Sequence, residues 1–237
     1  MSAHYEVELL GTELCGADVV TLRFSRPEGY SFAAGQWFRL TLHTAEGELA
    51  ETFSHCSGPG DPFLEMTTRL SGSVFKRALA ALATGARATI TGPGGRLALP
   101  AGAERVCFIT GGTGITPIRS ILRDAAGTAR VFDDALLLYG NRDQSCAPFA
   151  EELSALGAIG VRVVLCFEVA RDSWVGERGF IDAEMVRRHV DPKDGRPFMV
   201  AGPPVMVEAI ERVLDELDIE PGLRLIEHFG TATHHAV

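Results

Sequence analysis

The stretch Gly111-Gly112-Thr113-Gly114-Ile115-Thr116-Pro117 decides the fold of this chain. The apolar run 106–110 before it resembles a short buried strand of a parallel sheet. After it, Ile118, Ile121 and Leu122 recur at helical spacing, and Pro117 suits a first helical turn. A strand, glycine turn and helix in this order leave unpaired N–H groups at the positive end of the helix dipole, where anions bind. The turn is neither GxGxxG nor a P-loop, so it predicts a nucleotide phosphate site without specifying the nucleotide.

The first hundred residues are predicted to form an antiparallel β domain. Short runs of β-forming residues recur between turns rich in glycine and proline. One helix is expected from Ser73 to Gly85, because the apolar side chains in that segment share one helical face. Many short strands with a single helix are typical of a small closed barrel. The predicted strands are 7–9, 19–24, 37–42, 49–54, 63–69, 87–91 and 96–99.

The pattern changes near 100–103, and strands then alternate with amphipathic helices. This alternation predicts parallel βαβ units whose ligands bind at the carboxyl ends of the strands. We therefore expect an N-terminal antiparallel β-barrel over residues 1–101 and a Rossmann-like α/β domain with a parallel sheet over 102–237. The small polar tail from residue 230 is expected to fray. The predicted strands after 106–110 are 136–139, 161–167, 198–201 and 223–227, and the helices are 118–125, 149–156, 182–189 and 205–217.

Composition excludes several classes of protein. The 237 residues carry a formal net charge of −9, which disfavours a nucleic-acid binder. No apolar run approaches the roughly 18 residues that a membrane helix needs, and the first residues lack the basic and apolar regions of a secretory signal. The five cysteines form no CxxC pair, which argues against disulfides and against a zinc or iron–sulfur site. These features predict a cytoplasmic protein without a bound metal.

A series of short motifs runs along nearly the whole chain. They are Gly35-Gln36-Trp37, Thr52-Phe53-Ser54 with Ser57, Gly72-Ser73-Val74-Phe75, Gly92-Pro93, the 111–117 turn, Tyr139-Gly140-Asn141-Arg142, Gly202-Pro203-Pro204 with Met206, and finally Glu227 and Phe229. Each motif alone is weak, but in this order and at this spacing the set resembles the ferredoxin–NADP reductase superfamily. The resemblance implies FAD in the β-barrel, NAD(P)H on the α/β domain and hydride transfer between them.

The resemblance also implies which residues contact the flavin. Phe53 would lie against the isoalloxazine ring and Ser54 would form a hydrogen bond near its reactive N5 atom. Without the resemblance, these two residues would be interpreted as a core aromatic ring and a strand hydroxyl. The other residues implied to contact the flavin are Ser57, Thr68, Arg69, Gly72, Ser73 and Val74.

On the nicotinamide side, the implied contacts lie at three turns. Asn141 and Arg142 would reach the adenosine ribose, and an arginine there favours the 2′-phosphate of NADPH over NADH. Asp143 adjoins them, so Arg142 as an ordinary loop charge stays an alternative. Ser54 and Glu227 are the implied catalytic residues, although Glu227 is equally compatible with a role in capping the last strand. The pyrophosphate contacts would be Gly112, Thr113, Gly114 and Thr116, and the nicotinamide contacts Gly202, Pro203 and Pro204.

Two positions depart from the family pattern. Glu51 stands where the family carries the arginine that binds the flavin pyrophosphate. A carboxylate beside a diphosphate is repulsive by about 1 kcal/mol even in water-like surroundings. Either Glu51 turns away and Lys76 or Arg77 supplies the charge, or FAD binds weakly, or FMN replaces it; we expect FAD at reduced affinity. Ala201 replaces a family cysteine near the nicotinamide; because hydride transfer needs mainly close, aligned rings, we expect activity to survive at a reduced rate.

The sequence thus predicts a flavin-dependent NAD(P)H oxidoreductase that passes electrons to a separate acceptor. A ferredoxin, a flavodoxin or an oxygenase component is the acceptor that the resemblance implies. The net charge of −9 would repel an acidic redox protein unless a local basic patch, such as Lys76-Arg77, receives it. The alternative function, based on Glu51 and Ala201, is a degenerate family member that acts as a nucleotide-binding or regulatory module.

Overall fold

The computed structural model describes residues 3–16 and 18–230. The chain divides into two compact units, one formed by Met1–Leu99 with Thr116–Arg130 and the other by Pro100–Ile115 with Val131–Val237. The expected domain boundary between residues 101 and 102 stays a prediction. The tail 231–237, expected to fray, lies outside the described residues.

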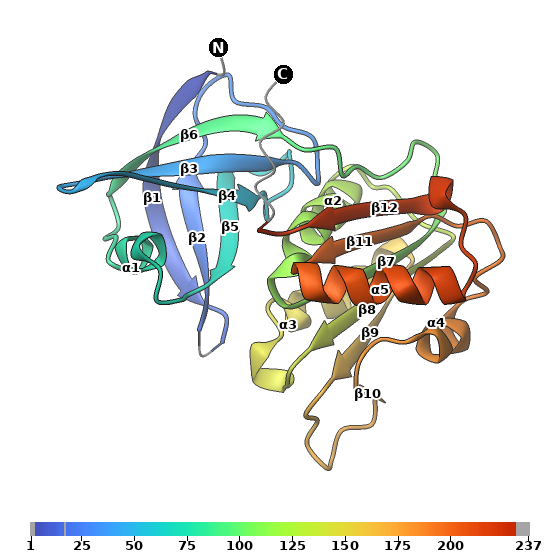
Figure 1. Cartoon of the computed structure of the whole chain (residues 1–237). Coiled ribbons are helices and arrows are strands. Elements are labelled where there is room, and N and C mark those ends of the chain that lie inside the picture. Colours follow the sequence, from blue (N-terminus) through green and yellow to red (C-terminus); the bar gives the residue numbers. More distant parts are fainter. Residues whose placement is uncertain (1–2, 17, 231–237) are drawn as a thin grey trace. The chain divides into compact units, whose positions relative to one another are not determined.

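The first unit is built on a six-stranded antiparallel sheet in the order β4-β3-β6-β1-β2-β5 (Figure 1). Apolar side chains alternate along the strands and form one core with Phe75 and Leu79 of helix α1. Just beyond β4, the Cys56 amide donates to the Glu65 carbonyl of β5 at 2.8 Å, which links the two edge strands. The antiparallel β-domain is therefore confirmed. Its elements are β1 (His4–Leu14), β2 (Val19–Ser25), β3 (Trp37–Thr44), β4 (Gly47–Ser54), β5 (Phe63–Arg69), α1 (Val74–Ala80) and β6 (Arg87–Gly94).

The strand predicted at 96–99 is wrong. The segment 95–100 after β6 has no strand assignment. The Trp37 indole packs directly on Gly94 and Gly95; a Cβ on Gly94 would lie 2.4 Å from that ring. Leu97 is buried, and its carbonyl oxygen would lie 2.2 Å from a Cβ on Gly35. Leu97 therefore gives the segment a hydrophobic strand pattern while its backbone packs against a glycine turn.

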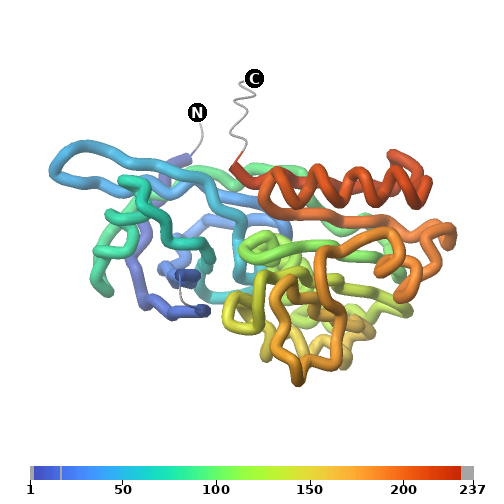
Figure 2. The backbone as a smooth tube through the Cα atoms, turned by 60° about the horizontal axis from the view of Figure 1, so that its bottom comes forward, coloured from blue at the N-terminus to red at the C-terminus, as the bar shows by residue number. Residues whose placement is uncertain are grey.

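The second unit is built on a six-stranded parallel sheet in the order β10-β9-β8-β7-β11-β12. Figure 1 shows helix α5 running along the sheet beside β11 and β12, and it labels the short strand β10 on the long connection that leaves β9. Figure 2 shows this connection as an orange loop. The expected parallel α/β fold is confirmed, with β10 missed from the sequence. Its strands are β7 (Arg105–Gly111), β8 (Asp134–Asn141), β9 (Val161–Phe167), β10 (Glu177–Arg178), β11 (Phe198–Gly202) and β12 (Arg224–His228), and its helices are α3 (Ala150–Ser154), α4 (Ala183–His189) and α5 (Pro204–Glu216).

Helix α2 (Ile115–Gly127) follows the glycine turn, and from Thr116 onward it packs with the first unit. It contributes buried isoleucine and leucine side chains, as its 3.6-residue pattern predicts. Within the described residues, no helix is long and apolar enough to cross a membrane.

Candidate functional site

The glycine turn after β7 is one turn of 3₁₀ helix, Gly112–Gly114, that leads directly into α2. Gly112 has a φ of +54°, and a Cβ built on it would meet nothing within 4 Å. In contrast, a Cβ on Gly114 would lie 2.4 Å from the Ala201 carbonyl oxygen and 2.7 Å from the Gly202 Cα. Gly114 thus permits β11 to pass close to the turn, while Gly112 leaves open space where a phosphate can approach backbone N–H groups.

Two side chains fix this turn. The buried Tyr139 hydroxyl of β8 lies 3.0 Å from the Gly112 carbonyl oxygen, to which it donates. The Thr110 hydroxyl at the end of β7 donates to the Ala201 carbonyl oxygen at 2.8 Å. The sequence motif included Tyr139 but did not identify it as the residue that positions the glycine turn.

Asn141 ends β8 with its side chain buried. Neither amide atom of this side chain has a hydrogen-bond partner among the described residues. Leaving a buried amide unpaired costs about 1–3 kcal/mol, and native proteins rarely do so without a bound partner. Gly140 pairs with Gly111 in the parallel register, so Asn141 and Gly112 follow the same pair on adjacent strands. The amide is thus suited to a ligand that binds at the glycine turn.

The two residues that follow Asn141 carry opposite charges and lie in different surroundings. Arg142 is exposed, whereas the Asp143 carboxylate accepts a hydrogen bond from the Ser145 amide at 2.8 Å. The same contacts lower the pKa of Asp143, led by its hydrogen bonds from Ser145. The Asp143 carboxylate, which adjoins Arg142 in sequence, is therefore engaged in hydrogen bonds within its own turn.

The carboxyl ends of β11 and β12 carry the remaining candidates of the second unit. β11 ends at Gly202, and Pro203 and Pro204 lead into α5. The Met206 sulfur would lie 2.9 Å from a Cβ on either Gly111 or Gly202, so its thioether packs beside both glycines. Glu227, half-buried, is aligned with Ala201 across the β11–β12 ladder. These residues share the edge of the sheet where parallel α/β proteins bind ligands, but their individual roles stay predictions.

In the first unit, Lys76 of α1 brings the principal flavin candidates together. Its ammonium lies 2.8 Å from the Thr68 hydroxyl of β5 and 4.2 Å from the Phe53 ring centroid of β4. The same nitrogen lies 2.7 Å from a Glu51 carboxylate oxygen. Burial lowers the pKa of Lys76 despite the opposing effect of Glu51. Arg77, the other cation considered from sequence, is exposed and bonds to the Gly72 carbonyl.

The other flavin candidates differ in accessibility. Ser54 is buried at the end of β4, and Gly72, Ser73 and Val74 are exposed at the start of α1, where the Ser73 hydroxyl accepts from the Lys76 amide. Arg69 forms an ion pair with Asp18 at 2.6 Å. Ser57 is fully buried, and its hydroxyl accepts from the Glu65 amide at 3.1 Å. The structure therefore gathers Phe53, Thr68 and the start of α1 around Lys76, whereas Ser57 is bonded within the protein.

His55, directly after Ser54, belongs to a buried aromatic cluster. Its ring stacks on Phe32 with centroids 3.6 Å apart, and its Nε2 lies 3.0 Å from the Tyr30 hydroxyl. Burial, assisted by the Arg26 charge, lowers the pKa of His55 to about 3. The imidazole is thus neutral near pH 7 and acts in packing.

The segment after Ser54 is held by a buried network that sequence reasoning missed. Arg119 of α2 donates from one nitrogen to the Cys56 carbonyl oxygen at 2.7 Å and to a Glu65 carboxylate oxygen at 2.9 Å. Arg23 of β2 binds the other Glu65 oxygen at 2.7 Å, and Ser120 donates to the Ser57 carbonyl at 2.7 Å. A charged residue within the apolar stretch of α2 was the available signal for this network.

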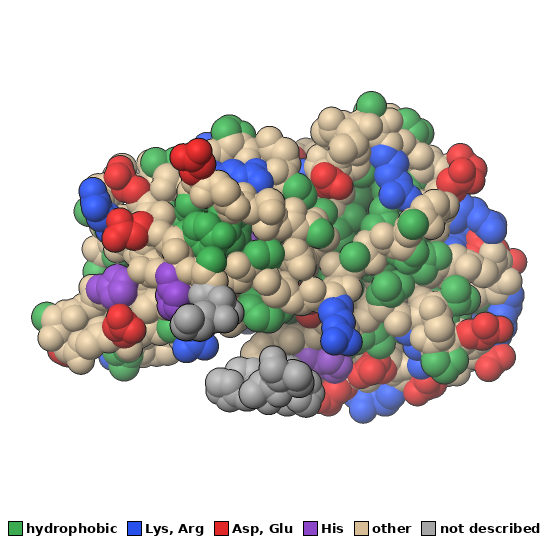
Figure 3. Space-filling view, turned by 90° about the horizontal axis from the view of Figure 1, so that it is seen from above, with side chains coloured by type: hydrophobic (Ala, Val, Ile, Leu, Met, Phe, Trp, Pro, Cys, Tyr) green, Lys and Arg blue, Asp and Glu red, His purple; other side chains and the backbone are tan. Residues whose placement is uncertain are grey.

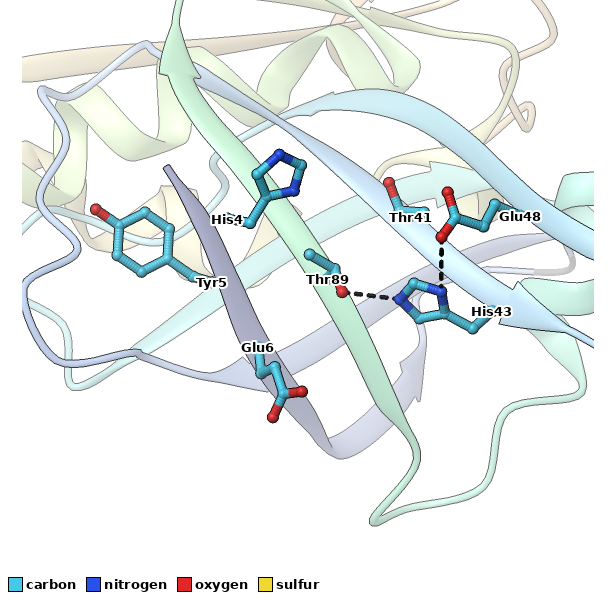
Figure 4. A pocket seen from close by; sticks show the side chains of 7 residues that line it. All are labelled: His4, Tyr5, Glu6, Thr41, His43, Glu48 and Thr89. Atoms are coloured by element: carbon cyan, nitrogen blue, oxygen red, sulfur yellow. Dashed lines mark hydrogen bonds and ion pairs between the residues drawn. The ribbon is translucent and has the colours of Figure 1, made fainter. Parts of the chain in front are cut away.

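A separate pocket of about 330 Å³ lies on the outer face of the first unit (Figure 4). There the His43 imidazole lies between the Thr89 hydroxyl, at 2.8 Å, and the Glu48 carboxylate, at 3.2 Å. Among the described residues no group of three or more histidine, cysteine or acidic side chains is arranged to hold a metal ion. The pocket contains none of the candidate cofactor residues, which separates it from the site above.

An antiparallel β unit and a parallel α/β unit with a glycine turn after its first strand define a class of nucleotide-dependent oxidoreductases. Residues 108–212 match the model of the oxidoreductase NAD-binding domain. Over 188 residues the chain is 31% identical to ferredoxin–NADP reductase B of Sorangium cellulosum, covering 76% of this chain and 77% of that protein. The chain belongs to the ferredoxin–NADP reductase family of oxidoreductases, whose members bind FAD and NAD(P).

Two further comparisons extend this result. The chain is 30% identical over 222 residues to the electron transfer component of the xylene/toluene monooxygenase of Pseudomonas putida, covering 90% of this chain and 61% of that protein. Its fold matches a ferredoxin NADP⁺ reductase from Neisseria gonorrhoeae, crystallised with FAD and NADP, with a TM-score of 0.82 at 24% identity, covering 95% and 97% of the two chains. The relatives therefore differ in the electron acceptors that their names state.

Proposed function

We propose that this protein binds FAD and oxidises NADPH or NADH, passing the electrons to a separate acceptor. The main support for the proposal is the glycine turn together with the buried Asn141 side-chain amide, which has no hydrogen-bond partner among the described residues. The open space at Gly112 and the Asn141 side chain together suit a phosphate and a neighbouring polar group of a nucleotide. Tyr139 keeps this turn in place before the nucleotide arrives.

The residues around Lys76 fit a flavin. Phe53 offers an aromatic face, Thr68 a hydroxyl and Lys76 a cation, all within one cluster of β4, β5 and α1. Ser54, at the end of β4, would donate to the flavin ring near N5, and Glu227 would exchange protons at the sheet edge. FAD, when bound, supplies the conversion between a two-electron donor and one-electron acceptors.

NADPH is the nucleotide that we propose as the preferred donor. An exposed Arg142 next to Asn141 is suited to pair with a 2′-phosphate. Because the Asp143 carboxylate is already hydrogen-bonded to Ser145, a 2′-phosphate does not have to displace it from Arg142. Exchange of Arg142→Ala should therefore raise the KM for NADPH several-fold and leave that for NADH unchanged; an NADH preference untouched by the change would refute the assignment.

For the acceptor we propose a small redox protein, either a ferredoxin or flavodoxin or an oxygenase component. The names of the Sorangium and Pseudomonas relatives support these two classes. The net charge of −9 opposes an acidic partner at long range. Figure 3 shows basic and acidic side chains interspersed on the surface of each unit. We place the protein in a reducing cytoplasm, which agrees with its five free cysteines.

A visible absorption spectrum tests the proposed function. The purified protein would be incubated with FAD, freed of excess flavin and reduced anaerobically with NADPH or NADH. Retained flavin bands that bleach on addition of nucleotide are expected. A colourless protein would favour the alternative of a nucleotide-binding or regulatory module, and retained FAD that no nucleotide reduces would refute the reductase.

A further inference from the structure

We propose that Lys76 is the cation that binds the flavin phosphate in this protein, and that Glu51 competes with the phosphate for it. The inference rests on the proposed flavin site and assigns the charge that the missing arginine would have supplied. It makes Lys76 a determinant of flavin affinity and Glu51 a residue that lowers it.

The first step is the placement of the ammonium. The Lys76 side chain is only 11% exposed, and its ammonium contacts residues of two strands of the first unit, β4 and β5. Glu51 lies on β4 at 2.7 Å and Thr68 on β5 at 2.8 Å, while the Phe53 ring lies beneath the ammonium at 4.2 Å. A cation over an aromatic face and beside a carboxylate is held firmly, so its position is set by the fold.

The second step is competition for partners. Phe53 and Thr68 are the residues that we expect to contact the flavin, and both now contact Lys76. A flavin that contacts Phe53 and Thr68 replaces these two contacts of the ammonium and leaves its ion pair with Glu51. The cation is then available to a phosphate oxygen of the same ligand.

The third step concerns Glu51. Its carboxylate is 35% exposed and neutralises Lys76 when no phosphate is present. Once a phosphate approaches, the same carboxylate repels it and competes for the ammonium. Arg77, by contrast, points its guanidinium to the Gly72 carbonyl and is exposed, so it is a suitable control for charge alone.

Riboflavin, FMN and FAD, which carry zero, one and two phosphates, separate this role from simple packing. Dissociation constants would be measured by fluorescence titration for wild type, Lys76→Met, Glu51→Gln and Arg77→Gln, with folding checked by circular dichroism. We expect Lys76→Met to weaken FMN and FAD binding at least tenfold and riboflavin binding less than twofold. Glu51→Gln should tighten FMN and FAD binding about fivefold, and Arg77→Gln should change each constant less than twofold.

Lys76→Arg provides the conservative variant, and it should bind FAD within about threefold of wild type because it retains the charge. Equal losses for riboflavin and FAD in Lys76→Met would show that Lys76 only supports the Phe53 ring, and would overturn the inference while leaving the flavin site intact. Unchanged constants in that variant would also overturn it. A wild-type protein that binds none of the three flavins would instead refute the proposed function, and the inference with it.

Discussion

At the scale of single residues, Gly114 is the position in the glycine turn that leaves no room for a side chain. Gly114→Ala would force a methyl group to within 2.4 Å of the Ala201 carbonyl oxygen, which belongs to the backbone of β11. We expect a loss of about 3 kcal/mol or more in the free energy of unfolding, measured by urea denaturation. Gly112→Ala is the matched control, because its Cβ meets no atom within 4 Å and its positive φ costs about 1–2 kcal/mol. Equal stability of the two variants would contradict this account.

Tyr139 acts on the same turn through a single hydroxyl. Tyr139→Phe keeps the buried ring and removes the donor to the Gly112 carbonyl. If the turn binds a nucleotide, the dissociation constant for NADP⁺ should rise about two- to tenfold, the equivalent of one ordinary hydrogen bond. Calorimetric titration checks the prediction, and an unchanged constant would show that the turn keeps its geometry without the hydroxyl.

At the scale of elements, Arg119 and Glu65 join helix α2 to strand β5 through a buried ion pair. Among the described residues, Arg119→Met would leave the Glu65 carboxylate with the more exposed Arg23 as its remaining ion-pair partner. We expect a loss of about 3–5 kcal/mol in unfolding free energy, as for other broken buried pairs. Adding Glu65→Leu should recover part of this loss, because no buried carboxylate is then left unpaired and the Arg23 guanidinium is half-exposed to solvent. Additive losses in the urea unfolding of the double variant would contradict the coupling.

The sequence predicted the elements better than the contacts between them. Period-2 and period-3.6 patterns located most strands and helices, since these patterns follow directly from which face is buried. The strand predicted at 96–99 was wrong because Leu97 is buried against the turn at Gly35, although its segment pairs with no strand of the described residues. The Lys76 cluster and the Arg119 network join residues distant in the chain, and no local periodicity encodes which of several cations meets a given acid.

At the scale of the whole molecule, the buried His55 makes stability depend on pH. Its pKa is about 3 in the folded protein and near 6.5 in an unfolded chain. As the pH falls, the unfolded state therefore binds a proton at this histidine before the folded state does. The contribution of His55 to the free energy of unfolding is fully present above about pH 6.5 and is lost as the pH drops toward 3. The loss attributable to His55 is about 4–5 kcal/mol at the acid end.

A single variant isolates this histidine from the acidic residues that also titrate. His55→Gln should flatten the dependence of unfolding free energy on pH between 6.5 and 4. Parallel pH profiles for wild type and His55→Gln would show that His55 gains its proton without disrupting the fold.

The interleaving of the two units constrains how this reductase can be recombined with its relatives. The buried partner of Glu65 on strand β5 is Arg119 of helix α2. In the sequence, α2 follows β7, the first strand of the parallel sheet. A gene fusion joined at residue 101 would combine a native Glu65 with a foreign α2, whereas a junction after Arg130 would transmit both together. A junction after Arg130, however, would pair a native β7 with a foreign β8 and β11 in the parallel sheet. Each structural unit is accordingly discontinuous in the gene, and no single crossover transmits both units whole.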